Sequence, residues 1–149
     1  AGMFARGADL SEQWLIDIDL SGADLSETRL RRCSLRSTNL SWANLSGADL
    51  SGAMLHHADL RDAVVDGITW SGASLHGACL RFLPLRKAAM SGVNLSGADL
   101  RGALLIDADL SGADLSGARL DDAKLWDATL TGATWDADTT WPSGFQPPR

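Results

Sequence analysis

The feature that most constrains the fold is a five-residue period that runs through almost the whole chain. Between Ala8 and Ala137 the sequence divides into 26 pentapeptides without an insertion or deletion. The central residue is Leu in 22 of them, and the other four centres are also apolar: Val65, Trp70, Met90 and Trp135. Two residues before the centre, 18 of the 26 positions are Ala. Nearly every repeat therefore carries a large and a small apolar residue at fixed positions.

A period of five fits neither a helix nor a continuous strand. On an α-helix of about 100° per residue, successive centres would be rotated by about 140°, so no apolar stripe would form. In a strand, an odd spacing would place every second centre on the opposite face. The pattern becomes consistent if the chain turns a corner once in each repeat. Four corners then close a square coil of 20 residues, and stacked coils pair as parallel strands about 4.8 Å apart.

Strings such as GADLS at residues 22–26, 47–51 and 112–116 resemble the A-(D/N)-L-x-x motif of pentapeptide-repeat proteins. The resemblance covers about 130 of the 149 residues. It implies an all-β fold, a right-handed quadrilateral parallel β-helix (solenoid), here of about 6.5 coils of four pentapeptides with capped ends. A disordered low-complexity tract is disfavoured, because such tracts lack a strictly placed apolar residue in every repeat.

We expect one domain over residues 1–149, with an N-terminal cap at 1–7, repeats at 8–137 and a C-terminal capping tail at 138–149. Prolines at 142, 147 and 148 end the strand geometry. Trp141 and Phe145 are expected to fold back over the open edge of the last coil.

The corners are marked by Gly, which recurs two residues after the centre in 12 repeats. A positive φ is accessible there because Gly has no Cβ. Other corners carry larger residues at this position, and we expect a different turn type at these: Arg32, Trp42, Phe82, Lys87 and Asp107.

Composition restricts the function classes. Thirteen basic against 19 acidic residues give a net charge of −6, which argues against binding nucleic acid or anionic membranes directly. No apolar stretch approaches the roughly 18 residues of a membrane span. Two cysteines cannot form the disulfide framework of a small secreted domain. These features predict a soluble, cytoplasmic protein.

No catalytic or cofactor motif is found, neither a P-loop, a dinucleotide fingerprint nor a nucleophile elbow. The many aspartates of the repeats are expected on exposed convex strands, whereas glycosidase chemistry requires a cleft. Cys33 takes an inward position and Cys79 an outward one on another face, beyond the reach of a disulfide. We therefore predict no enzyme and no cofactor.

A metal site is the one alternative that the histidines leave open. His56 and His76 are one coil apart on the same face, and His57 adjoins them at the corner. Three imidazoles could bind a metal, but no carboxylate or Cys falls in the same column. We favour three solvated histidines and predict no metal.

Two functions remain. The best-understood members of the family that the motif resembles mimic DNA and bind DNA gyrase or related topoisomerases. A rod of about 6.5 coils is about 31 Å long, and DNA of that length carries about 18 phosphate charges. The chain carries only −6, and its charge alternates in bands, with arginines concentrated in residues 29–48 and cations again in 81–98. The gyrase-binding DNA mimic is therefore the alternative, and a non-enzymatic scaffold or protein-interaction module is the leading prediction.

One apolar strip indicates where a partner would bind. Outward positions of one face, normally polar, are apolar at five places: Val64, Pro84, Leu104, Ile106 and Trp126. A contiguous apolar patch rimmed by charge is typical of an interface, and Arg86, Lys87, Asp107 and Asp127 supply that rim. We predict a protein partner, or self-association through a two-fold axis, on this face. The alternatives are that the C-terminal tail covers the strip or that the strip is merely tolerated on the surface.

Overall fold

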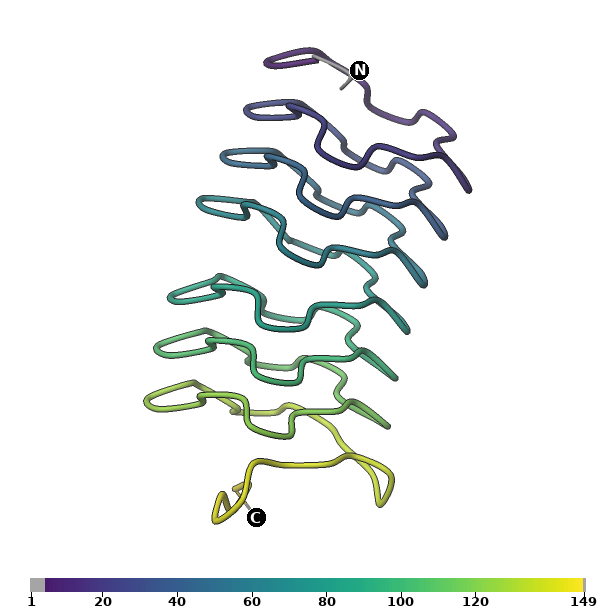
Figure 1. Cartoon of the computed structure of the whole chain (residues 1–149). Coiled ribbons are helices and arrows are strands. Elements are labelled where there is room, and N and C mark those ends of the chain that lie inside the picture. Colours follow the sequence, from purple (N-terminus) through teal and green to yellow (C-terminus); the bar gives the residue numbers. More distant parts are fainter. Residues whose placement is uncertain (1–4, 149) are drawn as a thin grey trace.

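The computed structural model describes residues 5–148, whose backbone winds as a square spiral stacked along one axis (Figure 1). Parallel β-bridges hold the spiral together, from Asp9↔Arg29 to Asp114↔Thr134, and each of these joins residues 20 positions apart. This is the register expected for a coil of four pentapeptides. The described residues contain no helix and no extended strand, since every pairing is a single-residue bridge. Two residues of each pentapeptide form the corner, so each side of the square is too short for more than one bridge.

The predicted inward positions form the core. From Leu20 to Leu130 every repeat centre is buried, and most central Leu side chains have no exposed surface. The indole of Trp70, 1% exposed, occupies the same position as these leucines. Centres of the first coil, Leu10 and Leu15, are only half-buried. Stacking therefore removes each apolar centre from water by placing it between the centres of the coils before and after it.

Polar residues at inward positions donate hydrogen bonds to backbone carbonyls of the preceding coil or of their own coil. The Thr38 hydroxyl donates to the Leu15 carbonyl, and the Cys33 thiol donates to the Leu10 carbonyl at 2.8 Å. A buried polar atom without a partner is costly, and these bonds explain why Thr and Cys are accepted where the repeat prefers Ala.

The prediction of a second turn type was wrong. Arg32, Trp42, Phe82, Lys87 and Asp107 all adopt a positive φ between 54° and 62°, as the corner glycines do between 64° and 71°. A square coil of fixed length needs the same turn at every corner, because one different turn would shift the centres that follow out of the stack. The left-handed conformation costs a non-Gly residue roughly 1–2 kcal/mol, and the packed core on both sides of the corner offsets that cost.

At the C-terminal end, one extra residue enters the register, and Arg119 pairs with Thr140, 21 positions on. Trp141 packs edge-on against Trp135, with ring centroids 5.6 Å apart, and stacks on Phe145 at 5.3 Å. All three side chains are partly buried against the core. The predicted N-terminal cap falls largely outside the described residues, which begin at Ala5.

Among the described residues, the widest interruption of the backbone ladder lies in one coil-to-coil step, which we call the split; at the following step the bridge between 84 and 104 is also missing. Bridges join Asp59 to Cys79 and Ser74 to Asn94, but the two bridges expected between them, 64 with 84 and 69 with 89, do not form. In Figure 1 the coils along one edge of the spiral are visibly further apart at this step than at the others. The split therefore opens two sides of the square, the corner between them and the two corners that flank them, while the remaining sides stay paired.

Candidate functional site

The structure brings most of the predicted apolar strip together on consecutive coils. Leu104 and Ile106 are half-buried on one coil, and Trp126, 64% exposed, lies on the next. The Asp107 amide donates to the Trp126 carbonyl at 3.0 Å, which fixes Trp126 directly beside the Ile106 corner. Pro84 is exposed on the preceding coil and is followed by Leu104, one coil further on. No bridge joins 84 to 104, but the Leu104 amide donates to the Leu83 carbonyl at 2.9 Å, which keeps Pro84 beside the other three residues of one apolar surface.

Val64 is separated from the other four residues. It is 43% exposed, but it lies on the far side of the split from Pro84, without the bridge that would join the two positions. The strip therefore has a main part of Pro84, Leu104, Ile106 and Trp126, and Val64 stands apart on the opposite lip.

The C-terminal tail borders Trp126 without covering it. A groove of about 470 Å³ is lined by Leu125, Trp126, Pro142 and Phe145, together with their neighbours. The Lys124 ammonium lies 5.9 Å from the centre of the Trp126 ring, close enough for a cation–π interaction. The exposed Trp126 thus has a cation on one side and an open groove on the other.

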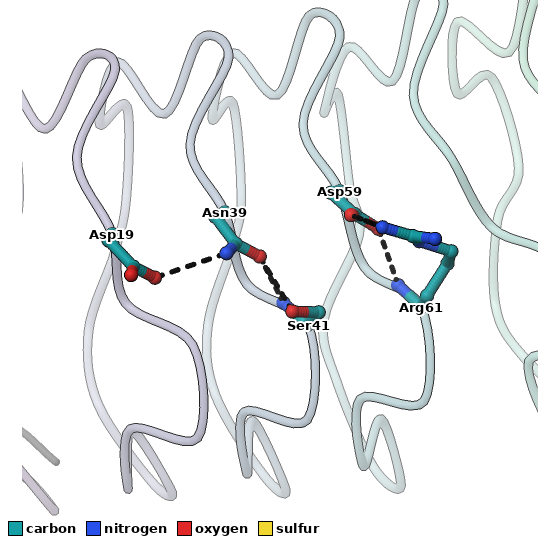
Figure 2. Close-up of polar contacts among 5 residues, drawn as sticks. All are labelled: Asp19, Asn39, Ser41, Asp59 and Arg61. Carbon is teal, nitrogen blue, oxygen red and sulfur yellow. Dashed lines mark hydrogen bonds and ion pairs between the residues drawn. The ribbon is translucent and has the colours of Figure 1, made fainter.

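The aspartates and asparagines that precede the centres have a structural role. In 11 repeats the side-chain oxygen accepts a hydrogen bond from the backbone N–H two residues on, at the start of the corner. Figure 2 shows three successive coils, in which Asn39 accepts from the Ser41 amide at 3.1 Å and donates to Asp19 at 3.1 Å. Asp59 on the next coil accepts from the Arg61 amide and binds the Arg61 guanidinium at 2.5 Å.

These bonds also decide the ionisation of the carboxylates. The Ser116 hydroxyl and amide lower the pKa of Asp114, and the Arg61 guanidinium lowers the pKa of Asp59. A carboxylate held ionised by fixed donors is a poor general acid, because catalysis at neutral pH needs a pKa near the working pH. Where these aspartates have a shifted pKa, the shift is downward, whereas a catalytic acid and base would have pKa values shifted in opposite directions.

The three histidines lie together, as the coil register predicts. The ring of His76 is 6.0 Å from that of His56 and 5.4 Å from that of His57, both edge-on. The His76 Nδ1 is hydrogen-bonded to the Ser96 hydroxyl at 2.8 Å. Burial, with the nearby Arg36 cation, lowers the pKa of His56. Among residues 5–148, no group of three or more metal-ligating side chains has the arrangement of a metal site.

Both cysteines are free thiols. Cys33 is fully buried and burial raises the pKa of its thiol, so little of the reactive thiolate forms at neutral pH. Cys79 is partly exposed and sits in the outward column between Asp59 and Asp99.

Sequence reasoning missed the split, although two residues signalled it. Pro84 has no N–H to donate to the preceding coil, and Trp70 places the largest side chain where a Leu is expected. In the sequence, Trp70 counts as one more apolar centre and Pro84 as part of the apolar strip, and their combined effect on one coil-to-coil step was not anticipated.

Comparison with known proteins agrees with the motif. A family model described as pentapeptide repeats matches the chain at residues 6–41, 15–52, 53–92 and 88–127. No curated protein matches. For the described residues, no helix is long and apolar enough to cross a membrane.

Several solved structures are similar. HetL, a pentapeptide repeat protein involved in heterocyst differentiation regulation in a Nostoc cyanobacterium, is 34% identical over 97% of this chain and 70% of its own, with a TM-score of 0.41. QnrB1, a plasmid-mediated fluoroquinolone resistance protein, is 21% identical over 91% of both chains, with a TM-score of 0.46. Rfr23, a pentapeptide repeat protein from a Cyanothece cyanobacterium, is 23% identical over 93% of this chain and 90% of its own, with a TM-score of 0.29.

Proposed function

Because the chain belongs to the pentapeptide repeat family, we propose that it is a non-enzymatic protein-interaction module that docks through the main part of the apolar strip. The observation that carries this proposal is the 64% exposure of Trp126 beside Leu104 and Ile106. Trp is the residue type most enriched at binding hot spots, and the repeat places polar residues at the corresponding positions of most other coils. A cytoplasmic setting, consistent with two free cysteines, is part of the proposal.

Self-association is the simplest form of this docking. A two-fold axis places the same patch on both protomers, so the surface needs to be complementary only to itself. Lys124 and Asp127 flank Trp126 with opposite charges, and a two-fold arrangement lets each charge of one protomer face the opposite charge of its partner.

Sedimentation velocity of a double variant, Leu104→Ser with Trp126→Ser, tests this proposal. We expect the wild-type protein to sediment as a dimer and the variant as a monomer, with nearly the same thermal midpoint. Trp42→Ser is the matched control, since Trp42 is 68% exposed on a corner away from the strip. A wild-type protein that is monomeric at about 100 µM, with no partner recovered through this face, would refute the proposal.

The DNA-mimic role at gyrase is the alternative, and charge argues against it. Asp109 and Asp114, which would have to imitate phosphates, each bind a serine hydroxyl and amide of their own corner. We expect no inhibition of gyrase supercoiling at low-micromolar protein. Potent inhibition that is lost in the double variant Asp109→Asn, Asp114→Asn would favour the DNA mimic instead.

A further inference from the structure

The split leaves a row of backbone groups without partners. Elsewhere along the rod, the amide of a centre donates to the next coil, as Leu45 does to Val64 and Leu75 to Asn94, at 2.8 and 2.7 Å. At the split no such bond forms from five successive centre and corner amides: Asp62, Val65, Gly67, Trp70 and Gly72. The acceptors opposite them are equally unused, namely the carbonyls of Arg81, Pro84, Arg86, Ala89 and Ser91.

Two side chains account for the opening. At the split, Pro84 has no N–H to donate to the Ala63 carbonyl. On the other side of the same coil, the Leu85 amide turns back to the Leu83 carbonyl at 3.1 Å instead of crossing to Leu104. One face further on, the buried indole of Trp70 stands between the smaller side chains Leu50 and Met90 of the adjoining coils. A rigid ring in place of a Leu needs more space along the stack, and the coils separate on this side.

The opening is a bounded cleft, not a frayed end. The ladder is closed on one side of it by the Leu60 amide donating to Cys79 at 3.0 Å, and on the other by the bond from Leu75. The cleft encloses about 260 Å³, runs round one corner, and is lined by residues 65–68, 70 and 84–89. That volume corresponds to roughly nine water molecules at about 30 Å³ each, so it admits main chain and small side chains only.

The groups that line the cleft specify the ligand. Backbone donors on one lip and backbone acceptors on the other are matched by an extended peptide, which offers both along its length. Arg86 and Lys87 on the second lip form no ion pair with any of the described residues. Arg86 follows position 84 by two residues, the offset at which Arg61 reaches Asp59. An acidic side chain beside position 84 would therefore meet a guanidinium.

We propose that the split binds an extended acidic peptide segment of a partner, which inserts between the coils as an added strand and turns one corner. The carbonyls of the segment accept from the amides of Val65, Gly67 and Trp70, and its own amides donate to the carbonyls of Pro84, Arg86 and Ala89. Inward residues of the segment are Ala or Gly, because the indole of Trp70 already fills the core. The proposal extends the interaction role to a second surface and does not require the apolar strip.

The probe is a fluorescein-labelled peptide, ADASGADASG, with acetylated and amidated ends. It copies residues 108–117 with both central Leu replaced by Ala. We expect saturable binding by fluorescence anisotropy. By NMR, the amides of Val65, Gly67 and Trp70 should exchange quickly in the free protein and slowly with the peptide bound, whereas the amide of Leu45 is protected throughout.

A double variant, Trp70→Leu with Pro84→Asp, restores the repeat at both positions and closes the ladder. It should protect the same amides without peptide and weaken peptide binding by about tenfold or more, the equivalent of one or two lost hydrogen bonds. Arg86→Ser should weaken binding of this peptide but not of its Asn counterpart, ANASGANASG. The double variant Leu104→Ser, Trp126→Ser is the matched control and should bind the peptide as wild type does.

Four results would overturn the proposal. The first is slow exchange of the three amides in the free protein, which would mean that the ladder is closed. The second is an absence of saturable binding up to about 1 mM peptide, and the third is equal binding by the Trp70→Leu, Pro84→Asp variant. The fourth is loss of peptide binding in the strip variant, which would place the peptide on the strip. A monomeric wild-type protein would refute self-association alone and leave the cleft result unaffected.

Discussion

Replacing Leu80 by Ala tests whether the core is a continuous stack. Leu80 is fully buried, and the centres above and below it in the same column, Leu60 and Leu100, are fully buried as well. The backbone cannot move in to fill the space, because the Leu80 amide donates to Asp99 at 2.8 Å and the Cys79 amide donates to Ala58 at 2.9 Å. The variant should therefore retain a cavity.

The expected loss of stability has two parts. Removing three carbon atoms forfeits about 0.8 kcal/mol each in transfer free energy, or about 2.4 kcal/mol. A residual void of roughly 60 Å³ adds about 1.4 kcal/mol at 24 cal/mol per Å³. The free energy of unfolding should fall by about 3–4 kcal/mol, within the range measured for Leu→Ala changes in other cores.

Urea titration followed by circular dichroism measures this change as a shift of midpoint at an unchanged slope. Leu10→Ala is the matched control, because Leu10 occupies the same repeat position on the first coil but is only half-buried. It should cost about 1 kcal/mol. A loss below about 0.5 kcal/mol for Leu80→Ala, or equal losses for both variants, would show that the centres are not stacked as a core.

The remaining predictions concern the corners and the carboxylates. Ser37→Gly should stabilise the protein by about 0.5–1 kcal/mol, because Ser37 has a φ of 54°, and Gly97→Ala should destabilise it by about 1 kcal/mol through φ alone, since a Cβ there meets nothing nearer than 3.8 Å. Urea titration should show that the two variants change the free energy of unfolding in opposite directions, and changes in the same direction would contradict the common turn. Because the pKa of Asp114 is lowered, its carboxylate contributes fully to the free energy of unfolding above about pH 4. This contribution disappears as the pH falls through the folded-state pKa of Asp114. Asp114→Asn should keep the stability of wild type at pH 7 and lose less of it at pH 3, whereas Asp114→Ala should cost about 1 kcal/mol at pH 7; an Asn variant as weak as the Ala variant would refute this role.

The five-residue period was enough to predict the fold, because the period itself excludes both regular elements. A centre at every fifth position requires one corner in each repeat, and the bridge register of 20 residues follows from four corners. The same arithmetic placed the three histidines together and kept Cys33 and Cys79 apart as free thiols. These results depend only on where a residue falls in the repeat.

Features that depend on the cooperation of neighbouring coils were harder to predict. Local propensity favours Gly at a positive φ, so Trp42 and Lys87 were expected in another turn, yet both take the conformation of the glycines. In a closed coil the stacking of core residues before and after the corner outweighs the preference of one residue. The split has the opposite origin, since the missing N–H of Pro84 and the large indole of Trp70 fall on the same step of the ladder.

A solenoid tolerates such a split because each coil contacts only its neighbours, so a defect at one step does not spread along the rod. The step before the split keeps its hydrogen bonds, such as Leu45 to Val64, and the step after it keeps all but that of Leu85, such as Met90 to Asp109. The core side chains at the split remain buried, with Val65 5% and Ile68 8% exposed. The cost of the split is therefore mainly in backbone hydrogen bonds, which water or a peptide strand can replace. For this reason the step between residues 62–72 and 81–91 is both the weakest of the rod and the one best suited to admit another chain.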